Sequence, residues 1–335
     1  MKCLSPAASL LIGFLLSSVS QIGAASPATL GEKLFFDERL SVDGTVACAN
    51  CHVPSSAFSD GKPVAVGVRR KHGSRNTPSV LGVAGAQIFS WEGRRTSLRD
   101  QVLDPFTNPF EMGLRDTKHL EARLGEISEY LELFADAFRG SEGATITAER
   151  VALALAAYLE TLPPANSAFS RFQRDPTRHP LDAQQQRGLE IFRGKAQCAE
   201  CHSLGADPAR DSQFHHSGIG WAQIQYDLPR LRREVDEAAL EGSNLGARIA
   251  ADRQWADLGR YVVTRDPKDI GVFRVPSLRN VAVTSPYMHD GSVATLDEAV
   301  RYEIYYRSLS TGKQLRLGVE EQAALVRFLE SLTDD

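Results

Sequence analysis

Cysteine, methionine and tryptophan are scarce in this sequence, which has 5, 3 and 3 of them among 335 residues. One cysteine, Cys3, lies at the extreme N-terminus, and the other four fall into two identical spacings, so no thiol is left for a structural disulfide. The charge has no dominant sign, because 38 basic residues face 42 acidic ones and the net charge is -4. This balance argues against nucleic acid or an anionic membrane surface as a partner.

Apolar runs long enough to span a membrane are also absent after the N-terminus. The N-terminal run, residues 7–19, follows Lys2 and precedes small residues around Ala24, which is the pattern of a signal peptide and its cleavage site. We expect residues 1–25 to be removed. The sequence therefore predicts an exported, soluble protein of the periplasm.

What the sequence contains twice is the pattern Cys-x-x-Cys-His, at Cys48, Cys51 and His52 and again at Cys198, Cys201 and His202. Two thiols about one helical turn apart can add to the two vinyl groups of one porphyrin, and the adjacent histidine then binds the iron. A thioredoxin-like pair needs no such histidine, and a zinc site needs two more ligands nearby. The sequence predicts two covalently bound haem c groups.

Each motif is preceded by a pattern typical of a helix start. Thr29 and Glu32 form a capping-box pattern before the first motif, and Asp182 with Gln185 forms another before the second. The chain thus reads as two related units, each with an entry helix and a haem turn.

We expect these units to be two cytochrome c-like domains, residues 26–165 and 166–335, after the signal peptide. Helical spacing of apolar residues continues through four further segments, which are 117–139, 147–162, 296–306 and 319–332. No alternating strand pattern of useful length occurs, so the predicted fold class is all-α with long loops. Residues 203–269 are the least regular stretch and read as a long loop whose role the sequence leaves open.

Five short segments outside the haem motifs make the chain similar to a known family; they are 75–79, 91–94, 108–112, 275–280 and 286–291. With them, the chain resembles the bacterial di-haem cytochrome c peroxidase and MauG superfamily over essentially the whole mature sequence. The resemblance implies a peroxidatic haem in the N-terminal domain and an electron-transfer haem in the C-terminal domain.

The resemblance also implies catalytic roles for three residues. Glu111 matches the acid/base glutamate over the N-terminal haem, which would move a proton between the peroxide oxygens. Gln101 matches a second residue that holds the peroxide by hydrogen bonds. Trp91 matches a tryptophan between the haems, a candidate electron relay. Without the family, these three would read as a surface carboxylate, a solvated helix glutamine and core packing.

The chain departs from the family pattern at the N-terminal haem. In peroxidases that need prior reduction, a histidine in a Gly-His pair closes this iron, whereas here Gly67 is followed by Val68. We expect a five-coordinate haem that is open to peroxide at rest, as in the MauG branch. His72 remains an alternative cap.

A second departure concerns the sixth ligand of the C-terminal haem. The family has a methionine or tyrosine fourteen residues after the histidine that corresponds to His289, and in this chain that position is Glu303. Met288, Tyr302 and Tyr305 are alternatives. The choice matters because hard oxygen ligands stabilise ferric iron and a thioether raises the potential.

One calcium ion between the domains is a further implication of the resemblance. Asn76, Thr284 and Pro286 match the positions that supply one side-chain and two backbone oxygens to this ion. Oxygen donors suit a hard cation. Without the family, all three would read as turn residues.

The function implied is reduction of hydrogen peroxide to water through high-valent iron at the N-terminal haem. Electrons would come from a small redox protein of the cytochrome c or cupredoxin type. The alternative is a MauG-like enzyme that oxidises a residue of a partner protein. A pure electron-transfer cytochrome would have no use for Gln101 and Glu111 over an open iron. A homodimer is compatible with the sequence.

Overall fold

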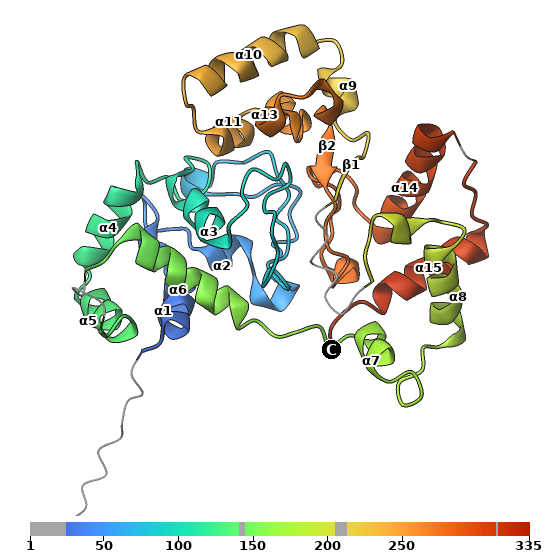
Figure 1. The fold of residues 1–335 in the computed structure, drawn as a ribbon, viewed down its shortest axis with the longest axis horizontal. Coiled ribbons are helices and arrows are strands. Elements are labelled where there is room, and N and C mark those ends of the chain that lie inside the picture. Colours follow the sequence, from blue (N-terminus) through green and yellow to red (C-terminus); the bar gives the residue numbers. More distant parts are fainter. Residues whose placement is uncertain (1–24, 141–144, 205–212, 313) are drawn as a thin grey trace, which may run out of the picture.

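A computed structural model describes residues 25–140, 145–204, 213–312 and 314–335 of the chain. Figure 1 shows helices α1–α6 on one side, α7, α8, α14 and α15 on the other, and α9–α13 above a short pair of strands. The predicted signal peptide lies outside the described residues except for Ala25, so it stays a prediction.

The first group of helices carries the first haem motif. Its members are α1 (Pro27–Phe36), α2 (Cys48–Cys51), α3 (Leu98–Thr107), α4 (Thr117–Gly125), α5 (Ser128–Ala137) and α6 (Ala148–Glu160). Their inner faces form one apolar cluster that includes Leu34, Phe106 and Leu155. Helix α1 packs on both α6 and the haem turn α2, so the first motif lies against this apolar cluster.

The second group repeats this arrangement around the second motif. It consists of α7 (Ala168–Arg174), α8 (Ala183–Arg193), α14 (Leu296–Thr311) and α15 (Val319–Glu330). Phe192 and Phe328 meet edge to face, with ring centroids 5.3 Å apart, inside a separate apolar cluster. Helices α8 and α15 therefore correspond to α1 and α6. The predicted division at residue 165 remains a prediction.

The prediction of a long loop at residues 203–269 is wrong between residues 221 and 264, where the structure has five helices, and residues 205–212 lie outside the described part of the chain. The five helices are α9 (Trp221–Ile224), α10 (Leu228–Leu240), α11 (Leu245–Ala251), α12 (Arg253–Asp257) and α13 (Tyr261–Thr264). They enclose a third apolar cluster around Trp255, whose indole nitrogen donates to Glu234 at 3.1 Å. Helix α10 was not predicted from the sequence, because its only buried residues are Leu231, Val235 and Ala238 and most of the others are charged or polar.

Two short strands, β1 (Phe214–His216) and β2 (Val272–Arg274), pair antiparallel, with Phe214 opposite Arg274 and His216 opposite Val272. Strands of three residues are too short to produce an alternating pattern. The fold class is otherwise confirmed as all-α. The remaining regular turns are 3₁₀ helices: Glu38–Leu40, Pro54–Ser56, Val68–Arg70, Cys198–Glu200, Pro267–Asp269 and Val281–Val283.

The helix-start predictions differ in outcome. At α8 the reciprocal box is present, because Gln185 N donates to Asp182 at 2.8 Å and Asp182 N donates to Gln185 at 3.0 Å. At α1 the predicted Thr29 cap is wrong: the cap is Ser26, which exchanges the two bonds with Thr29. Proline at the first helical position explains the earlier start.

Three of the four helical segments are confirmed as α6, α14 and α15, with α14 extending five residues further than expected. Residues 117–139 instead form two helices, α4 and α5, separated at Glu126 and Ile127. Among the described residues, no helix combines the length and apolarity needed to cross a membrane.

Candidate active site

The first haem motif forms a single helical turn. The His52 backbone N–H donates to Cys48 O at 2.8 Å, which places the two thiols and the imidazole on successive positions of one turn. The Nδ1 atom of His52 lies 3.2 Å from Phe58 O, so Nδ1 carries the proton and Nε2 keeps its lone pair. Burial lowers the pKa of His52, so the ring is neutral, as an iron ligand must be.

The second motif has the same local geometry on a 3₁₀ turn. His202 N donates to Cys198 O at 2.9 Å, and burial lowers the pKa of His202 to about 4. Cys201 Sγ lies 3.2 Å from Nε2 of His215, a residue of β1. The neutral histidine and the two thiols again form one donor set.

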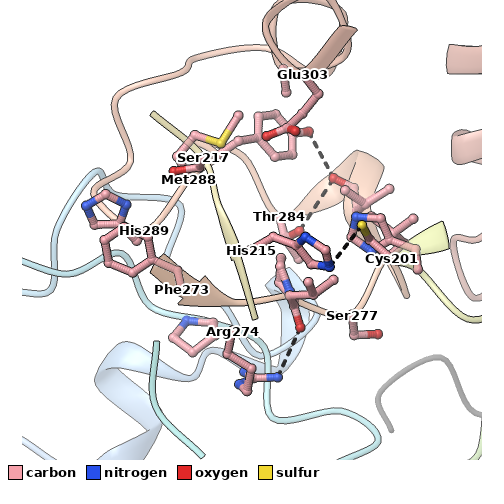
Figure 2. Close-up of a pocket in the computed structure, with 18 of the residues that line it drawn as sticks. Cys201, His215, Ser217, Phe273, Arg274, Ser277, Thr284, Met288, His289 and Glu303 are labelled. Atoms are coloured by element: carbon pink, nitrogen blue, oxygen red, sulfur yellow. Dashed lines mark hydrogen bonds between the residues drawn. The ribbon is translucent and has the colours of Figure 1, made fainter. Parts of the chain in front are cut away.

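A cavity of about 640 Å³ adjoins this second motif. Cys198, Cys201 and His202 line it on one side, and Figure 2 shows Glu303 and Met288 at a distance from Cys201 across the pocket. Two thiols, a neutral imidazole and an apolar cavity are the donor set and surroundings that a covalent haem requires. The residues present therefore fit a haem c group.

The alternatives for the sixth ligand separate by position. Glu303 and Met288 both line the cavity, whereas Tyr302 and Tyr305 are not among its lining residues and Tyr305 is 63% exposed. Burial raises the pKa of Glu303 to about 7, although the charge of Arg307 opposes this. A carboxyl group held in an apolar cavity gains from a cationic partner, which a ferric iron would supply.

Glu111 lies beside the first haem motif. Burial raises the pKa of the Cys51 thiol to about 12, and the negative charge of Glu111 is the next largest cause. The Asn108 amide donates to Glu111 Oε1 at 2.6 Å, and Val68 N donates to the Glu111 backbone oxygen at 2.8 Å. Burial raises the pKa of Glu111 even though Arg94 opposes it. One carboxylate oxygen is thus fixed, and the group is more basic than an exposed glutamate.

Gln101 projects from α3, whose C-cap residue is Asn108. Its Oε1 atom is buried and has no hydrogen-bond partner among the described residues. A buried amide oxygen of this kind is costly unless a bound molecule satisfies it. The local environment of Gln101 is therefore that of a ligand-binding group, and its oxygen makes no hydrogen bond to Glu111.

Val68 and His72 lie differently around the first site. Val68 is buried against the Glu111 backbone, and its aliphatic side chain offers no ligand atom. His72 is exposed, and its backbone forms an isolated antiparallel bridge with Val66.

Trp91 lies where the two halves of the chain meet. Its indole N–H donates to Asn76 O at 2.9 Å, its backbone oxygen accepts from Arg274 N at 2.8 Å, and its ring lines the C-terminal cavity. These contacts fix the ring between the strand β2 and the segment that follows the first motif.

The three predicted calcium positions lie around one region, because Asn76, Thr284 and Pro286 all line the same cavity. The Asn76 amide nitrogen donates to Lys62 O at 2.9 Å, which leaves its oxygen as the free end of the side chain. An amide oxygen in this orientation is a suitable donor for a hard cation.

Several residues at the two sites were not assigned from the sequence. Asn108 stood in a family segment but had no stated role, and only its bond to Glu111 reveals one. His215, His216 and Tyr306 line the C-terminal cavity. In the sequence, only the adjacent pair His215 and His216 could have indicated these residues. Tyr306 could not be linked to them, because α14 and β1 meet only in the tertiary structure.

An all-α protein with two such haem-binding turns is a di-haem c-type cytochrome in architecture. The chain matches the family model described as di-haem cytochrome c peroxidase over residues 25–178. It is 33% identical to the cytochrome-c peroxidase IdrP2 of Denitromonas iodatirespirans, over 94% of this chain and 84% of that protein. It is 34% identical to the methylamine utilization protein MauG of Methylorubrum extorquens, over 90% and 77%.

Among solved structures, a MauG-like protein associated with microbial copper homeostasis superposes with a TM-score of 0.73 at 28% identity, over 92% of this chain and 89% of that one. The chain belongs to the di-haem cytochrome c peroxidase and MauG family. It is therefore an oxidoreductase of the cytochrome-c peroxidase type, and the predicted resemblance is confirmed.

Proposed function

We propose that the chain is an exported di-haem peroxidase that reduces hydrogen peroxide to water with electrons from a small redox protein. The donor is of the cytochrome c or cupredoxin type. The observation that carries this proposal is the buried carboxyl group of Glu111, which is held by Asn108 and whose charge acts on the Cys51 thiol of the first motif. An electron carrier would need no such group.

The two haem groups, held by the four motif cysteines and by His52 and His202, supply the redox chemistry when bound. Glu111 takes a proton from the peroxide oxygen that binds and returns it to the oxygen that leaves as water. Asn108 holds one carboxylate oxygen, so the other faces the substrate. Gln101 supplies the acceptor that orients the peroxide, and Trp91 carries electrons between the two halves.

The remaining site residues have structural roles in this proposal. Val68 leaves the N-terminal haem without a capping ligand, which the exposed position of His72 supports. Glu303 is the sixth ligand at the C-terminal haem, with Met288 as the alternative that also lines the cavity. Asn76, Thr284 and Pro286 hold one calcium ion between the halves.

The test is the variant Glu111→Gln in the holo-protein, mixed rapidly with peroxide. We expect the spectral change to slow by about 10²- to 10⁴-fold, because the amide keeps the size of the group but cannot take a proton. The wild-type rate should fall as the pH drops through the pKa of Glu111, which burial raises above 4.5, and the variant should lose this dependence.

The matched control is Glu132→Gln, which changes an exposed carboxylate on α5 and should leave the rate unchanged. Haem content and resting spectra should be the same in all three proteins. An undiminished rate in Glu111→Gln would assign the proton transfer to another residue.

A MauG-like oxidation of a partner protein is the second candidate. The observation that favours it is the pair of departures from the peroxidase pattern, namely Val68 and the cavity-lining Glu303. Steady-state peroxide consumption with an artificial reductant supports the first function. Covalent change in a co-expressed partner, without such turnover, supports the second.

A further inference from the structure

Four ring side chains form a continuous row that passes the C-terminal cavity and ends at the protein surface. Tyr302 and Tyr306 of α14 are stacked with centroids 6.3 Å apart and an interplanar angle of 1°. Tyr306 is stacked on His216 at 5.9 Å and 15°, and His216 meets Trp221 at 6.0 Å. Tyr306 and His216 line the cavity, whereas Trp221 is 40% exposed.

The contact between Tyr306 and His216 is also a hydrogen bond, with Tyr306 Oη 2.7 Å from His216 Nδ1. The backbone N–H of Gly218 donates to the same Nδ1 atom at 3.1 Å. Because an N–H group can only donate, Nδ1 must be an unprotonated acceptor, and the Tyr306 hydroxyl must be the donor. The tautomer of His216 is thereby fixed, with its proton on Nε2.

This pair is held in place by the chain around it. A Cβ atom on Gly218 would lie 2.2 Å from the Tyr306 ring, so only glycine lets the backbone pass this close. Gly218 also has a φ of 73°, a conformation that glycine adopts freely. The loop after β1 therefore packs closely on the Tyr306 ring, which is in contact with His216.

A hydrogen bond from a tyrosine to a neutral histidine makes the tyrosine easier to oxidise. A phenol that loses an electron becomes strongly acidic and gives up its proton at once if a base is in contact. Here the base is His216 Nδ1, at 2.7 Å. Burial lowers the pKa of His216 and raises the pKa of Tyr306, so in the resting protein the proton stays on the phenol.

We propose that Tyr306, His216 and Trp221 form a proton-coupled electron relay between the C-terminal haem cavity and the surface at α9. The relay rests on the proposed peroxidase function, since hydrogen peroxide is the oxidant. One electron leaves Tyr306 for the oxidised haem site, and the phenolic proton moves to His216 Nδ1. The neutral Tyr306 radical then takes an electron from Trp221 and recovers its proton from His216. An external reductant finally returns one electron to Trp221.

The relay therefore carries one electron inward per cycle and leaves no net proton behind, so two cycles match the two electrons that one peroxide accepts. The row ends at Trp221, which is 40% exposed and can therefore be reached by an external donor. Electron entry is thus predicted at α9.

The experiment freezes the holo-protein after mixing with peroxide and without reductant, and records electron paramagnetic resonance spectra. We expect a protein radical shared between Tyr306 and Trp221, whose tyrosine component narrows when tyrosine with deuterated rings is incorporated. Tyr306→Phe keeps the ring but removes the proton donor and should lose at least nine-tenths of the tyrosine signal. Trp221→Phe should slow reduction of that radical by an added protein donor at least tenfold.

Tyr226→Phe is the matched control, because Tyr226 lies just after α9, is 88% exposed and takes no part in the row. Mass spectrometry gives a second readout: prolonged peroxide treatment should oxidise Trp221 in the wild type and in Tyr226→Phe, but not in Tyr306→Phe. Equal radical signals and equal Trp221 oxidation in Tyr306→Phe would overturn the relay.

Failure of the relay can be told from failure of the proposed function. If Tyr306→Phe behaves as the wild type while both consume peroxide, the relay alone is wrong. If the haem-loaded wild type consumes no peroxide, the proposed function is wrong and the relay falls with it.

Discussion

Glu92 is a fully buried carboxylate placed between two arginines, at a contact that links the two halves of the chain. Arg94 is in direct contact with it, and Arg75 lies 3.4 Å away and also donates to Ala256 O at 2.7 Å. Burial alone would raise the pKa of Glu92, but the charges of Arg94 and Arg75 outweigh it and lower that pKa to about 2. The arrangement fixes the segment that carries Trp91.

We predict that Glu92→Gln lowers the free energy of unfolding by about 3–5 kcal/mol, because the buried Arg75 loses its ion-pair partner and Arg94 keeps only Asp104. Chemical denaturation followed by circular dichroism measures this. The control Glu129→Gln breaks an exposed ion pair with Lys33 and should leave the free energy of unfolding nearly unchanged.

The same pair of proteins gives a pH test. A carboxylate whose folded-state pKa is lowered contributes stability above its unfolded pKa and loses it as the pH falls. The difference between wild type and Glu92→Gln should therefore be full above about pH 4.5 and shrink towards pH 2. A difference that stays constant over this range would show that charge is not the cause.

At the scale of elements, one helix pair recurs in both haem units. Gly31 of α1 faces Ala154 of α6, and Gly188 of α8 faces Ala324 of α15. A Cβ atom would lie 1.9 Å from Ala154 O in the first pair and 2.0 Å from Ala324 O in the second. Both crossings depend on the absence of a side chain, since backbone cannot move aside as a side-chain tip can.

We predict that Gly31→Ala and Gly188→Ala each lower the free energy of unfolding by about 1–3 kcal/mol through forced separation of the helices. The control is Gly125→Ala in α4, where nothing lies within 4 Å of the added Cβ. There the change should be neutral or stabilising by up to about 1 kcal/mol, because alanine favours the helix. Thermal unfolding of the three variants distinguishes steric from intrinsic effects.

At the scale of the whole molecule, the two haem turns belong to different apolar clusters. Cys48 packs against the first cluster and Cys198 against the second, and these clusters share no residue. Polar contacts join the halves, such as the bond from Arg279 to Pro163 O at 2.9 Å. Loss of one haem should therefore leave the other site folded.

We predict that the protein with both Cys198→Ala and Cys201→Ala carries one covalent haem by mass, whereas the wild type carries two. The corresponding Cys48→Ala and Cys51→Ala protein should also keep one. Loss of both haems in either variant would mean that the clusters fold only together. A wild-type protein with a single haem would contradict the di-haem assignment for this chain.

The sequence predicted some features because their physical cause is local. The haem turns need only a spacing of one helical turn, and the Asp182 cap needs only its third neighbour, so both could be read from residues in order. The all-α class followed from helical spacing in long segments. The cap at Ser26 was missed because Thr29 and Glu32 offered the same pattern nearby, and the charged helix α10 was missed because its apolar stripe is narrow.

What only the tertiary structure decided are relations between distant segments. Glu303 had Met288, Tyr302 and Tyr305 as alternatives until the packing of α14 placed Glu303 at the cavity and the segment before α14 placed Met288 there. Asn108 gained its role only from its bond to Glu111. Tyr306 meets His216 because α14 and the loop after β1 pack together across 90 positions of the chain. The sequence by itself determined which groups bind covalently, since that depends on neighbours along the chain. The fold determined which groups share protons and electrons, since that depends on contact in space.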